Sequence, residues 1–194
     1  EERRWLEAFT ADREKEIHEA KDAGLEVYYH IDLFVLPERI VERFRKEITD
    51  PATGRISLHR PKTLELHRAL FDEIFACYPQ IDGFIVRVGE TYLFYTPYHA
   101  GNGAVHYDPE RPVEDKQEDF VKLLDFLREE ICVKHNKKLF HRTWDTWVNR
   151  FHASKNFYLA VTDRIEPHPS LFFSIKHTQF DFHRWIPFNP CLTE

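Results

Sequence analysis

Apolar residues recur along the chain with two different spacings, one helical and one typical of strands. The first helical pattern ends near Gly24, a residue that often follows the last turn of a helix. A firmer pattern begins after Pro61, because proline is favoured in a first helical turn. The helices predicted from this spacing cover residues 5–20, 40–48, 61–75, 120–131 and 155–164.

Runs rich in β-branched and aromatic residues lie between these helices and predict strands. The predicted strands are residues 25–36, 83–88, 139–144 and 171–176. An alternation of strands and helices indicates crossover units and a parallel sheet. Four such strands make half of an eight-stranded barrel or a small open sheet. We predict an α/β fold in which parallel (β/α) units form part of a (β/α)8 TIM-type barrel, as one partial domain over residues 1–194.

Composition narrows the class of protein without naming a function. Among 194 residues, 42% are hydrophobic and 15% aromatic, which favours a folded globule over a disordered chain. The formal net charge is −6, and no apolar run approaches the roughly 20 residues that span a bilayer. We therefore expect neither nucleic acid nor a membrane as a partner. Since the chain has no methionine, we expect it to be a piece of a longer protein.

Cysteine and histidine give no pattern of metal ligands. Cys77, Cys132 and Cys191 are odd in number and far apart, which argues against a disulfide framework and a structural zinc site. The 12 histidines include no HxH or HExxH spacing. We expect no metal and no other cofactor; for His30 and His106 a structural role agrees with the sequence as well as a functional one does.

Charged side chains lie at the carboxyl end of every predicted strand. These are His30 and Asp32; Arg87 and Glu90; Arg142 and Asp145; and Lys176, His177 and Asp181. In parallel α/β folds these strand ends hold the ligand. Three cations close together repel one another unless acids or an anionic ligand balance them. The pattern predicts a site that binds a negatively charged ligand and acts on it with carboxylates.

Tryptophans lie close to the same segments. Trp144, Trp147 and Trp185 could form a wall on which the apolar face of a sugar stacks. Packing in the core is the alternative interpretation of each ring.

Three sequence blocks resemble one known family in order and spacing. They are "GFIVRVGET" (83–91), "HRTWD" (141–145) and "FFSIKHTQFDFHRWIPFNP" (172–190). The family is that of the family 67 glycoside hydrolases, the α-glucuronidases. Their (β/α)8 barrel removes 4-O-methyl-glucuronic acid from xylan-derived oligosaccharides with inversion. The resemblance implies that this chain contains strands three to six of such a barrel.

The resemblance also implies roles for individual residues. Glu90 stands where the family has its general acid, and Asp181 matches one of two carboxylates implicated as the general base. Arg87, Arg142 and Lys176 match the cations that hold the uronic carboxylate. We add Asp145, Trp144 and His177, which lie beside them, as substrate-binding candidates. The family's Ser-Glu-Gly-x-Pro-Gly-Pro run is replaced here by "GETYLFYTPYH".

The sequence thus predicts a glycoside hydrolase acting on uronic-acid-bearing oligosaccharides. Two other functions remain open. One is a catalytically inactive carbohydrate-binding barrel fragment, which needs only the cations and aromatic rings. The other is a barrel enzyme of different chemistry, such as a sugar isomerase or aldolase, for which Lys176 is the best reactive residue. Beyond the oligosaccharide, expected partners are a second copy of the chain or the remainder of the barrel, because half a barrel has uncovered edges.

Overall fold

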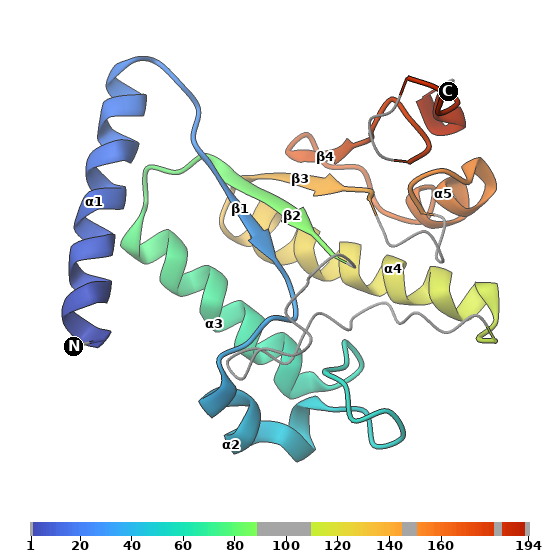
Figure 1. The fold of residues 1–194 in the computed structure, drawn as a ribbon, viewed down its shortest axis with the longest axis horizontal. Coiled ribbons are helices and arrows are strands. Elements are labelled where there is room, and N and C mark those ends of the chain that lie inside the picture. Colours follow the sequence, from blue (N-terminus) through green and yellow to red (C-terminus); the bar gives the residue numbers. More distant parts are fainter. Residues whose placement is uncertain (1, 89–109, 145–150, 181–183, 193–194) are drawn as a thin grey trace.

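The structure is a computed structural model, and it describes residues 2–88, 110–144, 151–180 and 184–192. Within these residues lies one sheet of four parallel strands in the spatial order β1-β2-β3-β4 (Figure 1). The strands are β1 (Tyr28–Asp32), β2 (Gly83–Arg87), β3 (Lys138–Arg142) and β4 (Leu171–Ser174). The predicted α/β class and the parallel sheet are confirmed.

Helices precede and connect the strands. They are α1 (Glu2–Asp22), α2 (Glu38–Ile48), α3 (Pro61–Cys77), α4 (Val113–Leu127) and α5 (Lys155–Thr162), with a π-helical segment η1 (Arg128–Lys134) after α4 and a 3-10 turn η2 (Pro190–Leu192). Local sequence explains several ends. Gly24 has φ +76 and ends α1, with Leu25 N–H donating to Ala20 O at 3.0 Å. Ser154 Oγ accepts from Phe157 N–H at the start of α5. No helix in the described ranges is long and apolar enough to cross a membrane.

Among the described residues, aromatic side chains of one face of the sheet contact rings on the side of the helices. Tyr29 and Phe84 are opposite each other in register, as are His141 and Phe173, so these four side chains share that face. Their helix-side partners are Tyr78 for Tyr29, Phe71 and Phe75 for Phe84, Phe151 for His141, and Phe151 and Tyr158 for Phe173. The helices therefore cover one side of a sheet whose strands follow sequence order.

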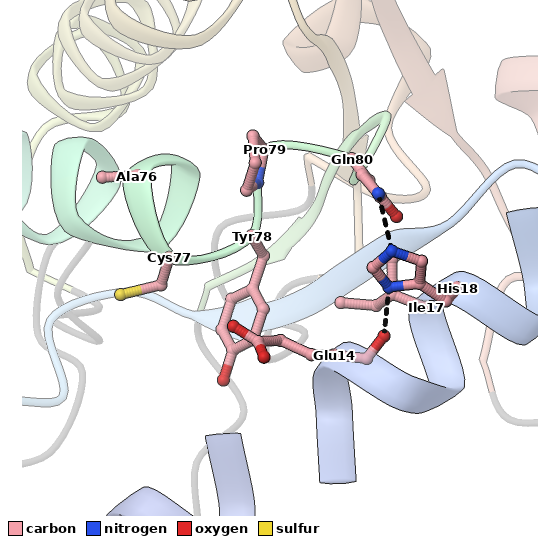
Figure 2. Close-up of a pocket in the computed structure, with 8 residues that line it drawn as sticks. All are labelled: Glu14, Ile17, His18, Ala76, Cys77, Tyr78, Pro79 and Gln80. Atoms are coloured by element: carbon pink, nitrogen blue, oxygen red, sulfur yellow. Dashed lines mark hydrogen bonds between the residues drawn. The ribbon is translucent and has the colours of Figure 1, made fainter. Parts of the chain in front are cut away.

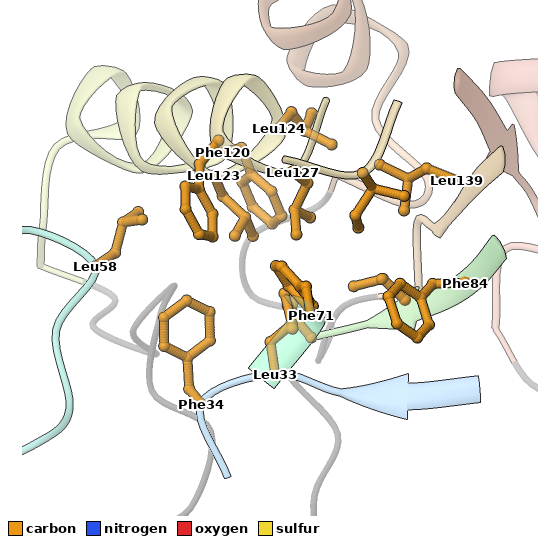
Figure 3. Packing of buried hydrophobic residues seen from close by; sticks show 14 of the residues in the cluster. Leu33, Phe34, Leu58, Phe71, Phe84, Phe120, Leu123, Leu124, Leu127 and Leu139 are labelled. Atoms are coloured by element: carbon orange, nitrogen blue, oxygen red, sulfur yellow. The ribbon is translucent and has the colours of Figure 1, made fainter. Parts of the chain in front are cut away.

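The core lies between that face and helices α3 and α4. Figure 3 shows Phe71 of α3 and Phe84 of β2 pointing toward Leu123 and Leu127 of α4. All four side chains are fully buried. Burial of a large apolar side chain contributes about 1.5–3 kcal/mol, so this layer holds the strands in place.

The first strand is shorter than predicted. The apolar run 25–36 continues beyond Asp32, but β1 ends there because the chain turns at Phe34. Phe34 has φ +63, a left-handed conformation that is uncommon outside glycine. Its N–H donates to Nε2 of His67 at 3.1 Å, and His67 Nδ1 donates to the Thr63 carbonyl at 2.7 Å. A contact across 33 residues thus ends the strand, which no local pattern could indicate.

Candidate functional site

Four of the side chains predicted at the strand ends, those of His30, Asp32, Arg87 and Arg142, lie on the face of the sheet opposite the core. We call this the second face, and define it by two rows of residues that follow the strand register. One row is His30, Ile85, Phe140 and Phe172, and the next is Asp32, Arg87, Arg142 and Ser174. The second row stands at the carboxyl ends of the strands, where parallel folds bind ligands.

Arg87 is paired with Asp32 of the neighbouring strand. Nε and Nη2 of Arg87 donate to the two carboxylate oxygens of Asp32 at 2.7 and 2.8 Å. This fork-to-fork geometry is the strongest arrangement for a guanidinium and a carboxylate. Arg87 therefore has two of its donors engaged by an acid of the sheet itself, while its charge still adds to the local field.

Arg142 has a different neighbour. Its Nη1 lies 3.5 Å from Nε2 of His30, two strands away. The pKa of His30 is lowered, first by burial and then by the nearby positive charges of Arg142 and Arg87. A neutral imidazole can accept from the guanidinium but does not cancel its charge. Arg142 is thus better placed than Arg87 to bind an added carboxylate.

Lys176 and Trp144 extend the same end of the sheet. Each lies two residues beyond the opposed pair Arg142 and Ser174, and Lys176 Nζ is 3.5 Å from the centre of the Trp144 ring. An ammonium over an indole face is a favourable cation–π contact. Trp144 Nε1 is buried without a hydrogen-bond partner among the described residues. The Trp144 ring thus stabilises the Lys176 side chain above it, while its own Nε1–H has no acceptor among the described residues.

Aromatic rings lie beside the charged row. Phe140 and Phe172 are stacked with their centroids 4.8 Å apart, and Tyr28 meets Phe140 edge-on at 5.1 Å. Phe172 remains 38% exposed. These rings place apolar surface next to the cations.

A buried polar network positions the chain that follows β4. Nε2 of His152 donates to the Thr178 carbonyl at 3.0 Å, which leaves Nδ1 to accept from the Thr143 hydroxyl at 3.1 Å. Burial lowers the pKa of His152, in keeping with this neutral ring. The fully buried Asn189 donates to the carbonyls of His152 and Lys176 at 2.9 and 3.0 Å. Together these bonds hold the backbone on both sides of His177.

Sequence reasoning missed His152 and Asn189. Neither lies at the end of a predicted strand, and their partners come from separate loops. Asn189 precedes a proline. Such an Asn-Pro pair indicates a turn, but it does not indicate that the asparagine side chain is buried. In the segment after β4, the structure shows an antiparallel bridge between Thr178 and Phe188.

The predicted site residues divide into two groups. Arg87, Arg142, Lys176 and Trp144 lie at the same end of the sheet, and the exposed His177 follows Lys176. Glu90, Asp145 and Asp181, together with Trp147 and His106, lie outside the described residues. Trp185 is 73% exposed beneath the Arg184 guanidinium, so it is not a core residue. The described part of the predicted site thus consists of its cations, His177 and Trp144.

A separate cavity lies at the opposite end of the sheet. It has a volume of about 350 Å³ and lies between α1 and the end of α3 (Figure 2). Both ring nitrogens of His18 are engaged there, Nδ1 with the Glu14 carbonyl at 2.9 Å and Nε2 with the Gln80 amide at 3.1 Å. Parallel sheets do not place their ligands at the amino ends of the strands. The second face is therefore the stronger candidate.

Two further observations bear on function. Within the described ranges, no three His, Cys, Asp or Glu side chains gather as ligands of a metal ion. No family model, no curated protein and no solved structure matches this chain. The likeness to the family 67 glycoside hydrolases thus rests on the three sequence blocks and remains a prediction.

Proposed function

We propose that this chain is part of a (β/α)8 barrel glycoside hydrolase that acts on uronic-acid-bearing oligosaccharides. The strand order supports the barrel. Strands that follow sequence order, with helices on one side only, curve in one direction as a barrel wall does, whereas doubly wound sheets reverse their order. In a closed barrel the second face would line the interior, and its charged row would stand at the catalytic end.

The observation that carries the proposal is the position of Arg142. It lies at the carboxyl end of β3 beside a neutral histidine, while the neighbouring Arg87 is already paired with Asp32. A guanidinium in this setting matches a carboxylate in both charge and geometry. The stacked Phe140 and Phe172 supply the apolar platform that a sugar ring needs.

The carboxylates that complete the chemistry are Glu90 and Asp181. In the sequence, Glu90 follows Arg87 by three residues and Asp181 follows Lys176 by five. In our proposal Glu90 protonates the glycosidic oxygen and Asp181 activates the attacking water. Inverting enzymes hold two such groups about 6.5–9.5 Å apart, which leaves room for the water.

Product analysis tests the proposal. We expect the protein, incubated with a uronic-acid-bearing xylo-oligosaccharide, to release the uronic acid with inverted anomeric configuration, as followed by NMR. The Glu90→Ala variant should release none, because the leaving oxygen then lacks its proton donor. Release at an undiminished rate by this variant would remove Glu90 from the mechanism.

Arg142→Ala should weaken binding of glucuronate by about 1.5–3 kcal/mol, which is the contribution of a hydrogen bond to a charged group. Binding of xylose, which has no carboxylate, should change far less. Calorimetric titration with both sugars gives the comparison, and Arg3→Ala on the exposed start of α1 is a control with the same loss of charge. An equal loss for both sugars would mean that Arg142 supports the fold and does not recognise the acid.

A carbohydrate-binding protein without hydrolytic activity is the second candidate. It is favoured by the fact that the cations and the aromatic platform occur together in the described part of the chain. Glucuronate binding that depends on Arg142, without any release of product, would select this candidate. A sugar isomerase or aldolase has less support, because Nζ of Lys176, its candidate reactive group, packs on the Trp144 ring.

A further inference from the structure

We propose that His30 positions Arg142 and takes up a proton when an acidic sugar binds. The inference rests on the proposed function, because it concerns the same anion site. The sequence left His30 open between a structural group and a member of the charged strand ends, and it indicated no proton uptake. His30 is exposed on the second face, and its Nε2 lies 3.5 Å from Nη1 of Arg142.

The first step is the geometry of the pair. Arg142 Nη1 is a donor in every state, so Nε2 of His30, at 3.5 Å, must be an unprotonated acceptor for the contact to be favourable. The distance is at the outer limit of a hydrogen bond, which indicates a weak contact. A neutral His30 therefore orients the guanidinium but does not hold it against a carboxylate ligand. A carboxylate can draw Arg142 away at little cost.

The second step is the set of charges around His30. Asp32 follows His30 by two residues on β1, and Arg87 lies opposite Asp32 on β2. Arg142 approaches His30 from β3. Asp32 favours the protonated ring, whereas the two guanidinium groups oppose it. Tyr28, the other neighbour on β1, is held neutral because burial raises its pKa. Arg87 is neutralised in part by its bond to Asp32, so Arg142 is the main adjacent positive charge.

The third step is what an anion does to this balance. A carboxylate bound to Arg142 cancels the charge that keeps His30 neutral, and it adds an acceptor for an imidazolium N–H. The ring then takes a proton from solvent, and the complex gains a second charged contact. By linkage, binding of the anion becomes stronger as the pH falls toward and below the pKa of His30 in the complex.

Calorimetry detects this proton directly. Glucuronate is titrated into the protein at pH 6.5 in phosphate and in imidazole, two buffers whose enthalpies of ionisation differ. We expect the measured binding enthalpy to differ between the buffers, because up to one proton per site moves from buffer to protein. Between pH 7.5 and 5.5 the affinity should rise by up to about tenfold per pH unit, and the affinity for xylose should not change.

Two variants separate the two parts of the proposal. His30→Gln retains an acceptor for Arg142 but cannot titrate, so its affinity at pH 7.5 should stay within about threefold of that of the parent, with no proton uptake. His30→Ala should lose both the positioning and the uptake. The pKa of His30, followed by NMR, should lie below 6.5 in the free protein and rise when glucuronate is bound.

The outcomes are distinguishable. Binding of glucuronate without proton uptake, or with full uptake in His30→Gln, overturns the role of His30 and leaves the proposed function standing. No binding of glucuronate at any pH overturns the proposed function, and this inference falls with it. If the His30→Gln variant takes up no proton and keeps its affinity for glucuronate at pH 7.5, the result supports both the role of His30 and the proposed function.

Discussion

Gly83→Ala should prevent the chain from reaching its native sheet. A Cβ atom added to Gly83 would lie 1.8 Å from the backbone oxygen of Lys138 and 2.6 Å from its carbonyl carbon. These are main-chain atoms of the adjacent strand, so no side-chain rotation relieves the collision. We expect a loss of more than about 4 kcal/mol, a large share of the 5–15 kcal/mol that a domain of this size has.

Chemical denaturation followed by circular dichroism measures the effect. Gly24→Ala is the matched control, because Gly24 has φ +76 and nothing within 4 Å of an added Cβ atom. Its cost should be about 1–2 kcal/mol, the penalty of a left-handed conformation alone. If Gly83→Ala costs no more than Gly24→Ala, β2 and β3 are not packed as closely as the structure shows.

Acid should destabilise the protein through His141. This ring is fully buried on the core side of β3, and neither of its nitrogens has a hydrogen-bond partner within the described ranges. Burial lowers its pKa to about 4. The unfolded chain, with an ordinary histidine pKa of about 6.5, therefore binds the proton more readily than the folded chain does between pH 6.5 and 4. The free energy of unfolding therefore decreases as the pH is lowered from 6.5 to 4, by about 3 kcal/mol in total.

His141→Leu is the test of this assignment. Leucine is similar in size and does not titrate, so the slope of unfolding free energy against pH should flatten between pH 6.5 and 4. At pH 7 the variant should be more stable by about 1–3 kcal/mol, because two buried polar atoms without partners are removed. His67 and His152, whose pKa values are also lowered by burial, should leave a residual slope. An unchanged slope would mean that water reaches the ring.

The order of elements was predictable because the signals are local. Pro61 marks the start of α3, Gly24 follows α1, and each strand lies within an apolar run that is bounded by polar residues. Such signals depend on residues a few positions apart, and they survive in the tertiary structure. The parallel sheet followed from the alternation of elements.

The ends of elements were less predictable. β1 stops short of the predicted residue 36 because Phe34 contacts His67 from α3. The helical pattern 120–131 was one segment in the sequence, but the structure divides it into α4 and a π-helical segment that begins at Arg128. Arg128 bonds to the Glu166 carbonyl at 2.8 Å, 38 residues away. Both boundaries lie at residues that contact distant parts of the chain.

By itself, the sequence determined that charged side chains stand at the ends of four apolar strands. That much follows from the order of residues. Only the tertiary structure decided that Asp32 neutralises Arg87 while Arg142 faces the neutral His30. These partners are 55 and 112 residues apart, and the order and register of the strands alone bring them together. Charge in a site depends on neighbours in space, and neighbours across a parallel sheet are separated in sequence by a whole crossover connection.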